Sequence, residues 1–179
     1  MHATRILLGM AENNAWSNEV LHRALSGLTD GEVKATRTSF FPTIHLTLTH
    51  ILLVDWFYID GLTESGRGRA AFEVDEPYAT LGEITKAQRA SDRRLVEFVR
   101  SLDGESALEK KVKLLFRSGP ADEKVVNVLL HLFEHQIHHR GQVHAMMSGT
   151  KVTPPQLDEF FLDGDAPARE VVMQEIGLR

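Results

Sequence analysis

The chain has 179 residues, of which 42% are hydrophobic and 25% are charged, and its formal net charge is −5. These values are typical of a folded globular protein and exclude disordered and collagen-like chains. The net negative charge argues against nucleic-acid binding, because neutralising phosphates requires a basic face. The sequence contains no cysteine, which excludes disulfides, thiolate nucleophiles and cysteine-ligated metals.

The length fits one domain, so we expect residues 1–179 to form a single unit with a substantial core. The apolar run near the N-terminus is short and is soon interrupted by Glu12, which argues against a signal peptide. No stretch approaches the roughly 18 unbroken apolar residues of a membrane span. We therefore expect a cytoplasmic protein that binds no membrane.

A first long helix is predicted from about Thr4 to Leu28, where apolar residues recur at helical spacing. Asn14 and Asn18 interrupt its inner face, and we expect them to bond to a neighbouring helix or to water rather than to ligate a metal. Trp16 is expected to pack in the core.

A second helix is predicted after Pro42, because proline is tolerated in the first turn of a helix. It is apolar on two sides: Ile44, Leu48, Ile51, Leu52 and Ile59 line one, and Leu46, Leu53 and Phe57 line the other. A four-helix bundle fully buries one side of each helix, so the surplus side predicts packing against a second subunit.

Two residues of this second helix carry potential chemistry. His50 lies on the stripe of Leu46 and Leu53 and should face another helix, whereas His45 lies on a different side. Asp55 is expected to accept hydrogen bonds from a partner helix, and the alternative is a bond to a metal-ligating histidine.

A glycine-containing connection over residues 61–77 leads to a third helix, which Thr80 and Glu83 start with a capping box and which runs to about Leu102. Arg89 and Asp92 are three residues apart, so we expect them to pair on its surface. Residues 109–117 alternate weakly and predict a short strand or hairpin.

The last long helix is predicted from about Asp122 to Met147. It carries His135 and His139, four residues apart, at the rim of its apolar stripe, so both imidazoles can point at one spot. His131 and His138 fall further round and should be more exposed. Gly141 in mid-helix suggests the close approach of another backbone.

The tail is expected to dock on the bundle through three apolar residues and to end in a short helix from Ala166 to Ile176. The three docking residues are Leu157, Phe160 and Phe161. Together these elements predict an all-α four-helix bundle.

A metal ion held by His135 and His139 needs a third ligand, and His50 is the best partner. Three neutral nitrogen ligands with room for water form an open Zn²⁺ site, which Ni²⁺ or Fe²⁺ would also accept. The pattern is not the HExxH of a zinc peptidase, because Gln136 stands where the general base would be, and Glu134 points away.

Arg140 follows directly on His139. It is the nearest group that could meet a carboxylate on a reactant, but its position on the apolar arc favours a structural role, in which it anchors helices through a buried ion pair.

The segment HLFEHQIHHRGQVHAMM resembles the signature of the DinB (DinB/YfiT-like) family, in which a histidine, three residues and then HRGQ lie on the last bundle helix. IHLTLTHILLVDWFYID resembles the second-helix motif of that family, with His50 followed five positions on by Asp55. NNAWSNEVLHRAL, AQRASDRRLVEFV and PPQLDEFFL resemble its first helix, third helix and tail, so the resemblance covers nearly the whole chain in order.

This resemblance implies a four-helix bundle, usually a homodimer, with His50, His135 and His139 as ligands of a divalent metal ion, Zn²⁺ or Ni²⁺. Characterised relatives are thiol transferases and isomerases. We therefore expect a metal-dependent enzyme that uses a low-molecular-weight thiol on a small electrophile. The alternatives are a non-catalytic, stress-related metal-binding bundle and a metal-dependent hydrolase.

Overall fold

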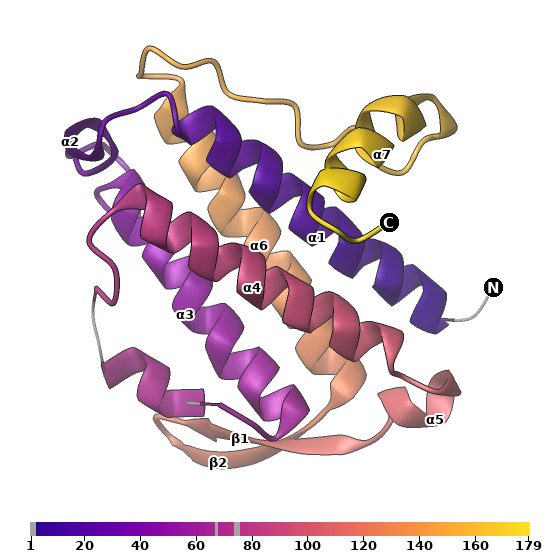
Figure 1. Cartoon of the computed structure of the whole chain (residues 1–179). Coiled ribbons are helices and arrows are strands. Elements are labelled where there is room, and N and C mark those ends of the chain that lie inside the picture. The colour runs from indigo at the N-terminus through magenta and orange to yellow at the C-terminus, as the bar shows by residue number, and fades with distance from the viewer. Residues whose placement is uncertain (1–2, 67, 74–75) are drawn as a thin grey trace.

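The computed structural model describes residues 3–66, 68–73 and 76–179. Its four long helices are α1 (Ala3–Leu25), α3 (Ile44–Thr63), α4 (Leu81–Arg100) and α6 (Val125–Met147), which form a bundle (Figure 1). This confirms the predicted four-helix bundle. No helix in the described ranges is both long and apolar enough to span a membrane.

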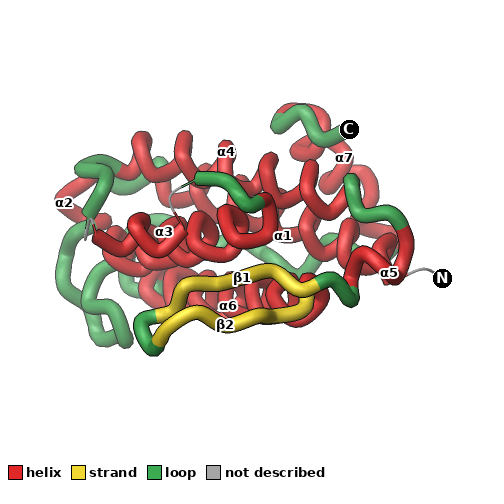
Figure 2. The backbone as a smooth tube through the Cα atoms, turned by 90° about the horizontal axis from the view of Figure 1, so that it is seen from below, coloured by secondary structure: helices red, strands yellow, loops and turns green. Residues whose placement is uncertain are grey.

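Short elements connect and cover the long helices. They are α2 (Asp30–Val33), η1 (Gly68–Glu73), α5 (Gly104–Leu108), β1 (Lys111–Phe116), β2 (Gly119–Lys124), η2 (Asp163–Asp165) and α7 (Ala166–Glu175). β1 and β2 pair antiparallel as a hairpin that lies across one end of the bundle (Figure 2). The predicted hairpin and short C-terminal helix are therefore confirmed. Residues 67, 74 and 75 of the predicted connection lie outside the described part.

Helix boundaries follow local capping. The Thr43 hydroxyl accepts from the Leu46 N–H at the start of α3, and Thr80 and Glu83 form the predicted capping box at the start of α4. α6 begins at Val125 rather than near Asp122, because Asp122 belongs to β2 and pairs with Lys113.

The apolar core is divided along the bundle axis. One cluster, which includes Ile59, Leu95 and Leu129, lies toward the hairpin, and another, which includes Leu21 and Ile84, lies toward α2. Between them, all four long helices contribute buried polar side chains, which we call the buried polar layer. Its members are Asn14, Asn18, Asp55, Gln88, Asp92, Gln136 and Arg140.

The second apolar side of α3 is covered within the chain. Phe57 is buried, and its ring centroid lies 5.6 Å from that of Phe72 in η1 and 5.4 Å from that of Phe116 in β1. Leu53 is buried as well. This side of α3 therefore gives no reason to expect a second subunit, and the homodimer stays a prediction.

The tail docks mainly through one aromatic residue. Phe160 is buried with its ring 5.7 Å from that of Trp16, which confirms that Trp16 packs in the core. Leu157 is half-buried against the cluster near α2. Phe161 is 58% exposed and lies against α1 only at the edge of its ring, where a Cβ added at Gly9 would be 3.4 Å from Cε1, so its predicted docking is only partial.

Candidate metal centre

Three histidines from two helices meet at one point. His50 comes from α3, and His135 and His139 come from successive turns of α6. One ring nitrogen of each lies within 4.8 Å of one ring nitrogen of the others, and the Nε2 atoms of His50 and His135 are 3.0 Å apart. The structure thus brings together the three histidines that the sequence singles out.

The local sequence explains this convergence. Residues four apart on α6 present His135 and His139 on one side, and their ring centroids lie 4.4 Å apart. Phe41, which precedes α3, covers the group, with its ring 4.6 Å from that of His50 and 5.8 Å from that of His139. Sequence reasoning missed Phe41, because a residue before a helix shows no periodicity.

A side-chain amide sets the tautomer of His139. The Nε2 amide group of Gln142 can only donate, and it donates to His138 Nε2 at 3.0 Å. This bond fixes the orientation of the amide, so that its oxygen faces His139. That oxygen accepts from His139 Nδ1–H at 2.9 Å. The Nε2 lone pair of His139 is thereby left free to bind a metal ion.

All three imidazoles are held neutral. Burial lowers the pKa of His50 to about 4, with a further contribution from His139. Burial also lowers the pKa of His135 to about 3, and the neighbouring histidines add to this effect. The pKa of His139 is lowered by burial too. Neutral imidazoles keep the lone pairs that metal ligation requires.

The donor set fits a divalent ion. Three nitrogens at about 2.1 Å from a tetrahedral Zn²⁺ would lie about 3.4 Å from one another. The Nε2 atoms of His50 and His135 are 3.0 Å apart, and the ligand nitrogen of His139 lies within 4.8 Å of both other ligand nitrogens. Two Nε2 lone pairs that face each other at 3.0 Å repel unless a proton or a cation lies between them. With three protein ligands, such an ion keeps a coordination position for a small molecule.

The other histidines lie outside this group. His131 and His138 are exposed, as predicted. His45 is 2% exposed, and its Nε2 contacts the Tyr78 carbonyl oxygen at 3.1 Å, away from the group. Glu134 is exposed, so it points away as predicted.

Asp55 belongs to the buried polar layer behind the histidines. It accepts from Gln88 Nε2 at 2.7 Å and from Gln136 Nε2 at 2.5 Å. These bonds confirm that Asp55 accepts from partner helices. Among the described residues it has no bond to a histidine of the group, so the alternative role is not observed.

Arg140 anchors α6 to α1. It is 5% exposed and donates to the side-chain oxygens of Asn14 and Asn18 and, at 3.2 Å, to that of Gln136. Its structural role is therefore confirmed, but the bonds go to amide oxygens. Within the described ranges the predicted direct ion pair is absent, so that part of the prediction is wrong.

The predicted surface pair of Arg89 and Asp92 is wrong. Asp92 is 4% exposed and accepts from Asn14, Asn18 and Gln88 at 2.9–3.1 Å. Arg89 instead forms a two-bond ion pair with Glu19 at 2.6 and 2.8 Å. A three-residue helical spacing allows two side chains to pair, but it does not reveal that Asp92 faces inward.

Burial shapes the charge of this layer. It raises the pKa of Asp92 to about 8, with Asp55 as a second cause, and it raises the pKa of Asp55 to about 6. Burial also lowers the pKa of Arg140 to about 10. Near neutral pH the layer therefore contains one carboxylate, one neutral carboxylic acid and one guanidinium, which leaves it electrically balanced.

The expected close approach of a backbone to Gly141 is not observed. A Cβ atom placed there would have no heavy atom within 4 Å among the described residues, and the position is exposed. The glycine therefore has no packing role against the described residues.

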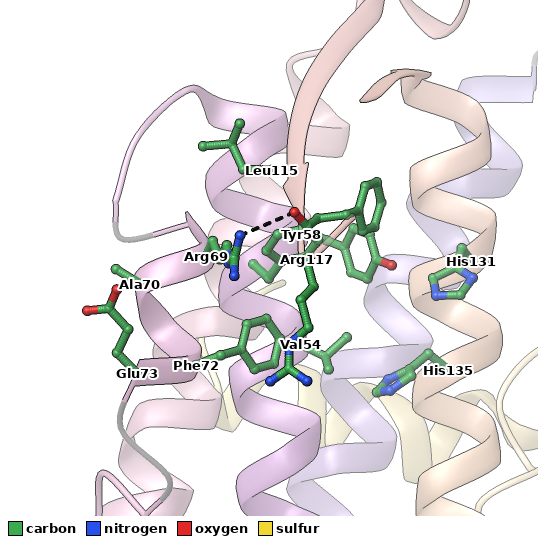
Figure 3. A pocket seen from close by; sticks show the side chains of 12 residues that line it. Val54, Tyr58, Arg69, Ala70, Phe72, Glu73, Leu115, Arg117, His131 and His135 are labelled. Carbon is green, nitrogen blue, oxygen red and sulfur yellow. Dashed lines mark hydrogen bonds between the residues drawn. The ribbon is translucent and has the colours of Figure 1, made fainter. Parts of the chain in front are cut away.

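A cavity of about 800 Å³ opens beside the three histidines, between α3, α6, η1 and the end of β1 (Figure 3). Of the three, only His135 lines it. Arg69 and Arg117 line it as well, and sequence reasoning missed both. They lie in a connection and a hairpin turn, where no periodic pattern marks a residue as functional.

Comparisons with known proteins bear on the family and the fold of the chain. The family model described as the DinB family matches residues 2–170. The crystal structure of a DinB-like protein from Bacillus cereus is similar, with a TM-score of 0.61 and 22% identity, over 79% of this chain and 90% of that one. A comparison with curated proteins finds no match.

Proposed function

Because the chain belongs to the DinB family and its three clustered histidines could hold a metal ion, we propose that it is a divalent-metal-dependent transferase or isomerase that uses a low-molecular-weight thiol. The observation that carries this proposal is the convergence of three neutral imidazoles with no carboxylate in the group. We propose Zn²⁺ or Ni²⁺ as the ion, because both accept nitrogen ligands.

A bound divalent ion lowers the pKa of a thiol or of water and stabilises the anion that forms. Three neutral ligands do not offset the positive charge of the ion. The site as a whole would therefore be cationic, which favours an anionic reactant. In the proposed reaction the S–H proton passes to solvent and the sulfur forms a C–S bond with the electrophilic carbon. A transferase reaction then expels a leaving group with its electron pair. In an isomerase reaction the sulfur adds to a C=C bond and its π electrons move to a conjugated carbonyl; after rotation about the remaining single bond they return, re-form the C=C bond and expel the thiolate.

The residues around the group favour a thiol over water as the nucleophile. A free thiol has a pKa of about 8.5 and needs no strong base, whereas water usually relies on a general base nearby. The Gln136 amide stands where a zinc peptidase has its glutamate, and both ends of that amide are occupied, by Asp55 and Arg140. Glu134 is exposed and turned away.

The test starts with protein purified without nickel affinity and analysed for its metal content. The Co²⁺-substituted protein is then titrated with 2-mercaptoethanol, and turnover is measured with 1-chloro-2,4-dinitrobenzene. We expect one ion per chain, a visible-spectrum change on thiol addition and thiol-dependent product formation. A spectrum that does not respond to thiol would support a structural metal, and turnover of esters without thiol would support a hydrolase.

We also propose that the protein is a cytoplasmic homodimer, as the family resemblance implies. Light scattering at micromolar concentration tests the dimer, and the mass of a single chain would contradict it.

A further inference from the structure

The 800 Å³ cavity beside His135 has the size of a small-molecule site. Figure 3 shows residues of α3, η1, the β-hairpin and α6 facing it, with His135 on the α6 side. A molecule in this cavity would therefore have the candidate metal centre at one of its walls.

Aromatic side chains form much of the remaining wall. The rings of Phe57, Phe72 and Phe116 lie 5.4–5.6 Å apart, with Phe57 between the other two. Tyr58 lies nearer α6, with its ring 5.1 Å from that of His131. Phe72 is 41% exposed although it belongs to this aromatic group. Such walls fit a flat apolar body better than an extended polar one.

Two arginines place positive charge in the same cavity. Arg69 donates to the Phe116 carbonyl oxygen at 3.3 Å, and Arg117 has no hydrogen bond or ion pair within the described part of the chain. In Figure 3 the guanidinium of Arg117 extends into the cavity between Phe72 and His135.

Glu73 is the one acidic residue that lines the cavity in the described ranges. Figure 3 shows its carboxylate at the outer edge, directed away from Arg117. Among the described residues, the cavity therefore combines an excess of positive charge with a guanidinium that has no partner, and the planar fork of that group matches a carboxylate.

We propose that this cavity binds a small carboxylic acid with an apolar, preferably aromatic, body, and that Arg117 and Arg69 hold its carboxylate while its body faces His135. This inference rests on the proposed function, because it names the substrate class of the same site. The bound acid would be the electrophile, and Arg117 would determine the preference for an anion.

Fluorine NMR tests the inference with two unreactive probes, 3-(4-fluorophenyl)propionate and the matching neutral amide, titrated into zinc-loaded protein without thiol. We expect the acid to bind at least tenfold more tightly than the amide. Arg117→Gln should remove this preference, and Arg117→Lys should retain part of it, because lysine keeps the charge but not the fork.

Arg5→Gln is the matched control, because Arg5 is exposed and lies outside the cavity lining, and the substitution changes the net charge equally. It should leave the preference for the acid unchanged. Equal binding of acid and amide to the unaltered protein would overturn the inference, and so would an equal effect of Arg117→Gln and Arg5→Gln.

Metal-free protein separates this inference from the proposed function. A preference for the acid that survives metal removal and is lost in Arg117→Gln supports the arginine site, whatever the zinc assay shows. A preference that disappears with the metal and persists in Arg117→Gln would show that the ion is the anion partner, which overturns the role of Arg117.

Discussion

The Nε2 atoms of His50 and His135 face each other at 3.0 Å across the contact between α3 and α6. Neither nitrogen carries a charge near neutral pH, because burial lowers the pKa values of both rings to about 4 and about 3. Two neutral rings in this position can share one proton in an N–H···N hydrogen bond, but the buried Nδ1 of His135 then has no partner among the described residues. A cation would instead be bound by both Nε2 lone pairs.

Removing one ring of the group should abolish metal binding. We expect His135→Ala to reduce the Zn²⁺ content from about one ion per chain to less than a tenth, because two imidazoles alone bind weakly. Metal analysis after dialysis measures this. His131→Ala, which removes an exposed ring one turn before His135, should leave the content unchanged, and an equal loss in both variants would contradict the assignment.

Asp92→Asn should stabilise the protein at neutral pH. The raised pKa of Asp92, about 8, means that its native-state stability contribution is complete below the unfolded value of 3.8 and is lost as the pH rises toward 8. An asparagine removes this dependence and can still accept from Asn14, Asn18 and Gln88. We expect a gain of at least about 1 kcal/mol at pH 7 and a flatter profile of unfolding free energy between pH 4 and 8.

Urea titrations of the variant and the parent protein at several pH values test this prediction. A variant that is less stable than the parent protein at pH 7 would show that Asp92 is charged in the folded state and that its negative charge is needed.

His22 should contribute to acid unfolding. It is fully buried, burial lowers its pKa to about 4, and its Nδ1–H donates at 2.8 Å to the Thr85 hydroxyl, which itself donates to the Leu81 carbonyl oxygen. Since the folded pKa lies below the unfolded 6.5, the contribution is complete above pH 6.5 and is lost as the pH falls to about 4. Its size is up to about 3 kcal/mol.

His22→Asn keeps a donor for Thr85 but cannot take up a proton. The free energy of unfolding should then fall less steeply between pH 6.5 and 4 than in the parent protein. Both proteins are compared without metal, so that the other buried histidines contribute equally. Parallel profiles would contradict the prediction.

Two helical glycines should respond in opposite ways to alanine. Gly141→Ala should stabilise the protein by about 1 kcal/mol, because the position is exposed, lies in mid-helix and has open space for a methyl group. Gly61→Ala should destabilise it by about 1–3 kcal/mol, because the new Cβ would collide with Leu114 of the hairpin. Chemical denaturation measures both, and a destabilising Gly141→Ala would indicate that another chain approaches that face.

The sequence was informative where side chains repeat along a helix. The stripe through His50 and the four-residue step from His135 to His139 were sufficient to predict which rings meet. Periodicity could not identify Asp92 as buried, because an inward carboxylate and a surface carboxylate look alike until the partners on other helices are known.

Long-range contacts account for what the sequence did not reveal. On the second apolar side of α3, Phe72 from η1 and Phe116 from β1 cover Phe57, while packing against a second subunit stays a prediction. Arg117 in the hairpin turn reaches the cavity only because the hairpin lies across the bundle end. Such contacts join residues that are far apart in the chain and leave no local pattern.

The buried polar layer also affects the metal-free protein. If any long helix moved by one turn along the bundle axis, Arg140 or a carboxylate would face aliphatic side chains instead of its hydrogen-bond partners. The layer therefore fixes the axial alignment of all four helices. Gln136 and Arg140 each follow directly on a histidine of the group, so the heights of those rings are set before any ion arrives. The apoprotein should therefore be a preorganised receptor, and loading it should require little rearrangement of its backbone.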